Sequence, residues 1–337
     1  MSGASRRSPA AGREVAVTFD DLPAICITRG EVEAHRAITA RLLEALRSHR
    51  VPAIGFVNEE KLCTAGRVDS ERVDLLRDWL DAGFELGNHT YAHMDLHQSP
   101  VAAFQEDIAR GERVTRGLLD ARGMTMRYFR HPYLHTGTTL EAKRSVETTL
   151  AARGCRVAPV TVYNEDYLFA AAWDRAIERG DDGVARRVAD AYVPYIESQF
   201  EYYEQLSRRL LGREPRQILV LHANSINAGR LDALAHMLVR RGYAFVPLER
   251  ALEDDAYAVE DTYIGSEGIS WLQRWALNRG LGEGFLDGEP VTPDFVRAQS
   301  GVGREGRLVR WWTRCMCMRR RWARDSRRQA EVWRPGR

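Results

Sequence analysis

The sequence predicts an α/β barrel, in which parallel strands alternate with helices, followed by a C-terminal extension. The first observation is that short apolar or β-branched runs alternate with longer helical patterns, as in parallel sheets with helical crossovers. The second is that histidines and acidic residues follow directly after several of these runs. A chain of 337 residues suits one main domain with an appendage.

Seven runs are candidate strands, and this number favours a barrel. They are Glu14–Phe19, Ala53–Val57, Phe84–Gly87, Met126–Phe129, Arg156–Val162, Gln217–Leu221 and Ala244–Pro247. Segments with apolar residues three or four apart, typical of amphipathic helices that cover a barrel, are Glu31–His49, Glu71–Ala82, Pro100–Asp120 and Leu231–Arg241.

A long helical segment, Ala171–Leu211, exceeds an ordinary crossover and is rich in tyrosine and phenylalanine. Its aromatic residues either pack the helices onto the barrel or form one wall of a site. Both interpretations remain open from the sequence.

We divide the chain into four parts: an N-terminal arm at 1–13, the barrel at 14–252, a C-terminal extension at 253–300 and a tail at 301–337. The extension carries one candidate helix, Trp271–Asn278. The tail is basic and rich in Trp and Arg, and we expect it to lack fixed structure. Contact with nucleic acid or a membrane is the alternative for this tail.

Charge and cysteine content exclude several classes of protein. A net charge of +2 argues against a whole-protein nucleic-acid or membrane binder and favours a neutral partner. Five scattered cysteines are unlike a disulfide framework. No apolar leader precedes Val15 and no run is long enough to span a bilayer, so the expected location is the cytoplasm. If the start codon is misassigned, the sequence lacks a leader, and a secreted or periplasmic location is the alternative.

Residues with metal-binding side chains gather where candidate strands end. Carboxyl ends of parallel strands meet on one face of a barrel, so residues distant in sequence come together there. The first strand ends in Asp20 and Asp21, and the third is followed by His89 and His93. If the backbone there is helical or nearly so, the two imidazoles lie on one side. With one carboxylate they form a half-open site that suits zinc. Turn capping by Asp21 and ordinary surface histidines are the structural alternatives.

Two further strand ends carry polar residues of interest. The fourth strand runs into Arg130, whose guanidinium can hold a carboxylate in a bidentate pair, although a solvated charge is the alternative. A continuously apolar strand ends in His222, which can serve as a general acid or be a buried structural histidine.

In their order, these motifs resemble the polysaccharide deacetylase family, also called the NodB homology or carbohydrate esterase 4 family. The resemblance covers roughly Glu14 to Leu252 and implies a distorted (β/α)7 barrel. It implies one divalent metal ion, with zinc expected and cobalt, nickel or manganese possible alternatives, bound by Asp21, His89 and His93.

The resemblance also implies roles for the remaining residues. Asp20 would be the catalytic base and Arg130 its orienting partner. His222 would be the general acid, and Asp166 would tune it. The backbone N–H of Tyr133 would contribute to the oxyanion hole. The chain departs from the family pattern at three positions that shape the groove, so the substrate stays open: Leu22, Leu134 and Tyr167.

The expected function is therefore hydrolytic removal of an N-acetyl or similar acyl group from an amino sugar or polysaccharide. The alternative within enzymes is a cytoplasmic amidase or deformylase of the same fold that acts on a small molecule or a lipid-linked sugar. A catalytically silent sugar-binding module is the alternative from another class. The complete set of metal-binding and acid–base residues argues against that module.

Overall fold

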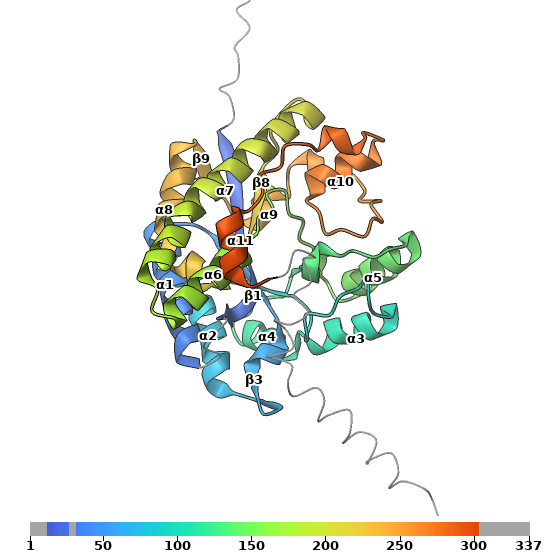
Figure 1. Ribbon diagram of the computed structural model, residues 1–337. Helices are drawn as coiled ribbons and strands as arrows, with labels where there is room; N and C mark the ends of the chain where they lie inside the picture. The colour runs from blue at the N-terminus through green and yellow to red at the C-terminus, as the bar shows by residue number, and fades with distance from the viewer. Residues whose placement is uncertain (1–11, 27–31, 303–337) are drawn as a thin grey trace, which may run out of the picture.

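The computed structural model describes residues 12–26 and 32–302, and these form a curled parallel sheet surrounded by helices (Figure 1). The strand order is β7-β6-β5-β2-β1-β8, with β9 also paired to β1, and every pairing in this sheet is parallel. Its strands are β1 Arg13–Ile25, β2 Ala53–Val57, β5 Glu85–Asn88, β6 Tyr128–Phe129, β7 Arg156–Val157, β8 Gln217–Asn224 and β9 Tyr243–Phe245. The predicted barrel class is thereby confirmed.

All seven predicted strands are present, although β7 is shorter than predicted. Beyond Val157 the chain makes only an isolated parallel bridge, from Val162 to Leu219 of β8. This bridge joins the β7 side of the sheet to β8, and it thus curls the sheet toward a ring. A small antiparallel hairpin, β3 Cys63–Thr64 with β4 Arg67–Val68, stands apart from the sheet and was not predicted.

Helices cover the outside of the sheet, with α1, α2, α7 and α8 on one side and α3 and α5 on the other (Figure 1). Their bounds are α1 Val32–Ser48, α2 Ser70–Asp81, α3 Val101–Arg110, α4 Arg113–Asp120, α5 Leu140–Ala152, α6 Asp166–Glu178, α7 Asp182–Leu211, α8 Ser225–Arg240, α9 Leu248–Ala251, α10 Trp271–Asn278 and α11 Asp294–Ser300. Helix α5 was not predicted. No helix within the described residues has both the length and the apolar character to cross a membrane.

The prediction of one helix over Pro100–Asp120 is wrong, because the helix breaks into α3 and α4 at Gly111. A Cβ atom at Gly111 would lie 2.3 Å from the carbonyl carbon of Thr90. The break therefore lets the loop after β5 pack directly on the helical backbone. This loop carries two of the predicted metal ligands.

The core forms where the helices meet the sheet. Trp79 of α2 is fully buried, and its ring lies 5.6 Å from that of Phe19 in β1 and 5.7 Å from that of Phe84. Aromatic contacts of this kind add to the free energy gained by burying apolar area. They anchor α2 against β1, the strand that carries both predicted acids.

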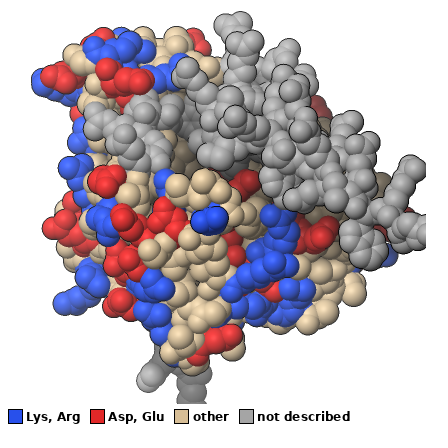
Figure 2. All heavy atoms as spheres, turned by 90° about the horizontal axis from the view of Figure 1, so that it is seen from below, with Lys and Arg blue, Asp and Glu red and all other residues tan. Residues whose placement is uncertain are grey.

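Residues beyond α9 pack onto the barrel: α10 contacts α7 and α11 contacts α6. Of the aromatic residues of α7, Tyr192, Phe200 and Tyr203 are fully buried and the other two are nearly so, which supports the packing interpretation of this segment. The predicted tail at 301–337 lies outside the described residues except for 301 and 302, and so does all of the arm except residues 12 and 13. Acidic and basic side chains are interspersed on the visible part of the face in Figure 2.

Candidate active site

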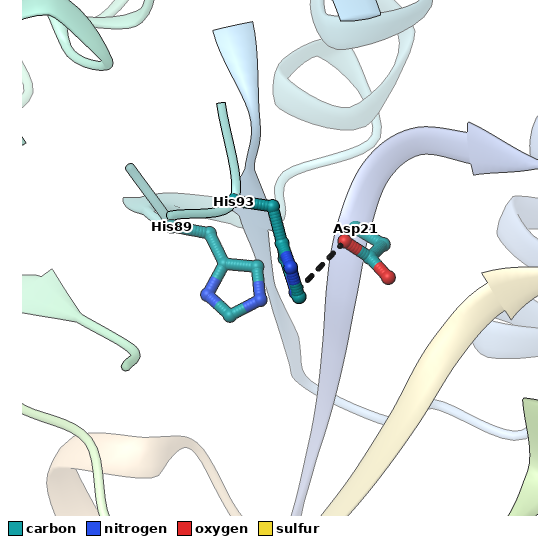
Figure 3. Close-up of side chains that lie close together, drawn as sticks. All are labelled: Asp21, His89 and His93. Carbon is teal, nitrogen blue, oxygen red and sulfur yellow. Dashed lines mark ion pairs between the residues drawn. The ribbon is translucent and has the colours of Figure 1, made fainter. Parts of the chain in front are cut away.

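The three predicted metal ligands lie together, with Asp21 inside β1, which continues to Ile25 beyond its predicted end at Phe19, and the two histidines in the loop after β5 (Figure 3). One potential ligand atom from each of Asp21, His89 and His93 lies within 4.8 Å of the other two, and all three residues are buried. His93 Nε2 is 3.6 Å from Asp21 Oδ1, and the two imidazole rings are 4.9 Å apart at their centroids. The side chains point toward a common centre.

The loop that carries the two histidines is irregular rather than helical. The two imidazoles therefore come together without the helical backbone that their four-residue spacing suggested. Thr90 and His93 adopt φ values of 64° and 51°, in the left-handed region. The loop is held by its neighbours: Asn88 Oδ1 accepts the Thr90 N–H at 2.7 Å, and an Asp107 carboxylate oxygen accepts the Ala92 N–H at 2.9 Å. Sequence spacing predicted the meeting of the rings but not the backbone that produces it.

The protonation states of this trio suit a cation. Burial lowers the pKa of His89 well below its usual value and that of His93 to about 4, so both imidazoles are neutral near pH 7. Although burial opposes it, Lys61 and His93 hold the pKa of Asp21 well below its usual range. His89 Nδ1 lies 2.7 Å from the Arg130 carbonyl oxygen, which fixes a proton on Nδ1 and leaves the Nε2 lone pair available. The donors present therefore fit a divalent ion such as zinc.

Asp20 lies next to this trio, buried in β1. Burial raises its pKa to about 6, against the opposing charge of Arg130. Arg130 is fully buried; one guanidinium nitrogen lies 3.4 Å from the Asp20 carboxylate, and another donates to Thr18 Oγ1 at 3.0 Å. The guanidinium therefore contacts the carboxylate, and its role in orienting a catalytic base stays a prediction. His89 Nε2 is 4.0 Å from Asp20 Oδ2, so this carboxylate lies at the edge of the candidate metal site.

His222 lies beside Asp20 in the sheet, because the two are register partners on the neighbouring strands β8 and β1. Its Nδ1 lies 2.6 Å from Asp166 Oδ1. Burial lowers the pKa of His222, but the charge and hydrogen bond of Asp166 outweigh it and raise the pKa to about 9. Asp166 Oδ2 accepts the His222 N–H at 2.8 Å and the Asn227 side-chain N–H at 2.6 Å. The imidazole is therefore held in the protonated form, with Nε2 as its free donor.

Tyr133 comes from a single turn, Pro132–Leu134, after β6. Its ring stands edge-on to His93, with centroids 4.5 Å apart. Tyr133 and Leu134 adopt φ values of 58° and 55°, in the left-handed region that favours glycine. The structure thus brings Tyr133 beside the trio, and the role of its backbone N–H stays a prediction.

Backbone strain concentrates at this site. Seven non-glycine residues in the described part of the chain have positive φ, and five of them belong to its loops: Asp21, Thr90, His93, Tyr133 and Leu134. Residues in such conformations persist only where their surroundings hold them, and they are common in functional sites.

The sequence analysis missed Lys61, whose Nζ lies 2.9 Å from Asp21 Oδ1. Lys61 follows β2, so the rule that singled out polar residues at strand ends could have found it. Asn227 was also missed, because it lies inside a helical pattern with no local sign that it contacts Asp166.

Part of the chain is similar in sequence to known proteins. The sequence model of the family described as polysaccharide deacetylase matches residues 7–151. Over these residues the chain is similar to the polysaccharide deacetylase family. The matched part contains the three candidate metal ligands and the strand that carries Asp20, whereas β8 with His222 lies beyond it.

Two chitooligosaccharide deacetylases resemble part of this chain. The one from Sinorhizobium fredii (strain NBRC 101917 / NGR234) is 28% identical over 127 residues, which are 38% of this chain and 50% of that protein. The one from Bradyrhizobium sp. (strain ANU 289) is 29% identical over 121 residues, 36% of this chain and 46% of that protein. The chain thus spans about half the length of these curated relatives.

Among solved structures, a family 4 carbohydrate esterase from Streptomyces lividans in complex with acetate aligns with a TM-score of 0.44 and 23% identity. The alignment covers 69% of this chain and 91% of that one.

Proposed function

We propose that this chain is a metal-dependent hydrolase that removes N-acetyl groups from an amino sugar, an oligosaccharide or a polysaccharide. The observation that carries the proposal is the common centre formed by Asp21, His89 and His93, with a buried carboxylate beside it and a protonated histidine on the adjoining strand. The matched family and the names of the two curated relatives support the same reaction class.

The trio would hold one divalent ion, and neutral imidazoles with a carboxylate favour zinc. When bound, such an ion supplies Lewis acidity: it polarises a carbonyl group and makes water a stronger acid. The remaining chemistry belongs to the residues of the chain.

Asp20 would act as the general base and take a proton from the water that attacks the amide carbonyl carbon. Arg130 holds the carboxylate in place for this step. As the carbonyl oxygen gains negative charge, the backbone N–H of Tyr133 would donate a hydrogen bond to it. Protonated His222 would then donate its Nε2 proton to the leaving nitrogen, so that the C–N bond breaks and an amine and acetate leave.

The direct test is the release of acetate from an N-acetylated chito-oligosaccharide by the zinc-loaded protein, followed by the appearance of free amine. We expect Asp20→Asn and His222→Ala each to lower turnover by about two orders of magnitude or more while the metal content is retained. His236→Ala is the matched control, because this exposed histidine contacts only its own helix and a neighbouring ring in the described structure.

The substrate range separates this proposal from its nearest alternative. Turnover of small amides or formylated sugars, with none of the acetylated oligosaccharide, would replace it with the amidase or deformylase function. Full activity of Asp20→Asn would refute the assigned base.

A further inference from the structure

The loop at residues 131–137, here called the Tyr133 loop, adopts a strained conformation in which only two backbone hydrogen bonds within the described residues are internal, Leu134 N–H to the His131 carbonyl and His135 N–H to the Pro132 carbonyl. Tyr133 and Leu134 are successive residues in the left-handed region, which side chains with a Cβ atom rarely adopt. Such a pair persists only when contacts from elsewhere determine it. Several of these contacts come from the C-terminal extension, which lies outside the family match; His97 and Lys143, whose Nζ donates to Thr136 Oγ1 at 3.2 Å, add others.

Arg274 of α10 makes the first set of contacts. Its guanidinium is fully buried and donates to the Leu134 carbonyl oxygen at 2.5 Å and to Thr136 Oγ1 at 2.8 Å. The guanidinium also forms an ion pair with Asp261 at 2.9 Å, and its Cζ lies 4.1 Å from the centroid of the Trp271 ring. These two contacts fix its position. Only the planar, multiply donating side chain of arginine can make these contacts together.

Gly268 makes the second contact, through the backbone. A Cβ atom at this position would lie 1.7 Å from the Tyr133 carbonyl oxygen and 3.2 Å from the His135 ring. The extension therefore lies directly against the peptide group of Tyr133. No side chain larger than hydrogen fits between them unless one of the two segments moves.

His97 makes the third contact and links both segments. Its Nδ1 lies 3.2 Å from the Ser266 carbonyl oxygen of the extension, and its Nε2 accepts the Gly137 N–H at 3.1 Å. The ring stacks on His135, with centroids 3.9 Å apart and an angle of 3° between the planes. His135 in turn pairs with Asp95 at 2.7 Å.

Asp95, His97 and His135 could be taken for a second metal site, since their donor atoms lie close together. An ion lies near the plane of each imidazole that binds it, however, and nearly parallel planes do not meet close to the rings. Both nitrogens of His97 also already contact the polypeptide. The cluster therefore fastens loops together.

We infer that the extension segment 261–274 positions the Tyr133 loop, and that Arg274 is a positioning residue for the backbone N–H that faces the developing oxyanion. The catalytic part of this inference rests on the proposed function. The structural part does not, because it concerns only how the loop is held.

The first experiment measures hydrogen–deuterium exchange of a peptide that covers residues 131–137. We expect exchange at least about tenfold faster in Arg274→Lys than in the unmodified protein, and no change in a peptide from α2. Arg279→Lys is the control, because Arg279 donates to the Leu210 carbonyl oxygen and not to the loop. Equal exchange in Arg274→Lys and the unmodified protein would overturn the inference.

A second pair of variants guards against a folding defect in Arg274→Lys. Gly268→Ala should accelerate exchange of the same peptide, since its methyl group would displace the Tyr133 carbonyl. Gly282→Ala in the same extension should not, because a Cβ there meets nothing within 4 Å. An unaltered Tyr133 loop in Gly268→Ala would contradict the inference independently.

Kinetics test the catalytic consequence. In Arg274→Lys we expect kcat to fall about tenfold or more and KM to change less than about threefold, with metal content retained, since the oxyanion donor acts mainly in the transition state. A rise in KM at unchanged kcat would instead assign Arg274 to substrate binding. If the unmodified protein releases no acetate, the proposed function fails, and the exchange measurements still decide the positioning inference.

Discussion

Replacing Asp166 with asparagine should disable His222 without changing the size of either side chain. Oδ2 of Asp166 accepts three N–H groups, from the His222 backbone and the side chains of Asn224 and Asn227, whereas among the described residues Oδ1 faces only His222 Nδ1. The new amide would keep its oxygen toward the three donors and turn its NH2 group toward Nδ1. His222 would then accept at Nδ1 and become a neutral imidazole.

The magnitude follows from the pKa of His222, raised from 6.5 to about 9. This difference corresponds to about 3 kcal/mol of preference for the protonated form. Near pH 8, about 90% of His222 is protonated at the raised value, against about 3% at 6.5. We expect turnover to fall about 100-fold in Asp166→Asn, the magnitude typical for loss of a general acid.

The assay is the pH dependence of kcat/KM for acetate release, together with an NMR titration of His222. Activity of the unmodified protein should fall on the alkaline side as His222 loses its proton, and on the acid side as Asp20 gains one. In Asp166→Asn the alkaline limb should move to lower pH. The exposed pair of Asp190 with Arg230 supplies the control, Asp190→Asn.

The pair of Asp166 and His222 also affects folding stability. The folded pKa of His222 lies above the unfolded one, so its stabilisation is fully present below about pH 6.5 and is lost as the pH rises through about 9. The free energy of unfolding, measured with urea at these two pH values, should depend less on pH in Asp166→Asn than in the unmodified protein. An unchanged pH–activity profile and an unchanged His222 titration in this variant would refute the reasoning.

Three further predictions concern the base, the ion and the core. In Asp20→Asn the acid limb of the pH–activity profile should disappear along with most of the turnover, whereas zinc binding measured by calorimetry should persist; a surviving acid limb would assign it to another group. His93→Ala should lose zinc binding by elemental analysis, while circular dichroism stays native, and stoichiometric zinc in this variant would exclude the trio as the ion's ligands. Trp79→Ala should lower the free energy of unfolding by about 3–5 kcal/mol in urea, against less than about 0.5 for Val291→Ala, whose side chain is 75% exposed. Similar unfolding midpoints for these two would contradict the packing argument.

The sequence alone predicted the seven strands, because each is a short apolar run followed by a polar break. The strand-end rule also predicted that Asp21, His89 and His93 would meet, since the carboxyl ends of parallel strands share one face. These predictions needed only local patterns and a general rule of topology.

Contacts between distant segments could not be predicted in this way. The break at Gly111 depends on the Thr90 backbone, and nothing in the local helical pattern signals it. Arg274 looks like a surface charge in the sequence of α10, yet it is buried against the Leu134 carbonyl, 140 residues earlier. The sequence likewise left α5 unrecognised, although Thr139 caps its first turn.

The pairing of β1 with β8 joins strands about 200 residues apart, as Val15 with Gln217. On a ribosome that adds about 5–20 residues per second, β1 would wait about 10–40 seconds for this neighbour. During that interval one edge of β1 stays unpaired, and an unpaired edge invites association with other chains.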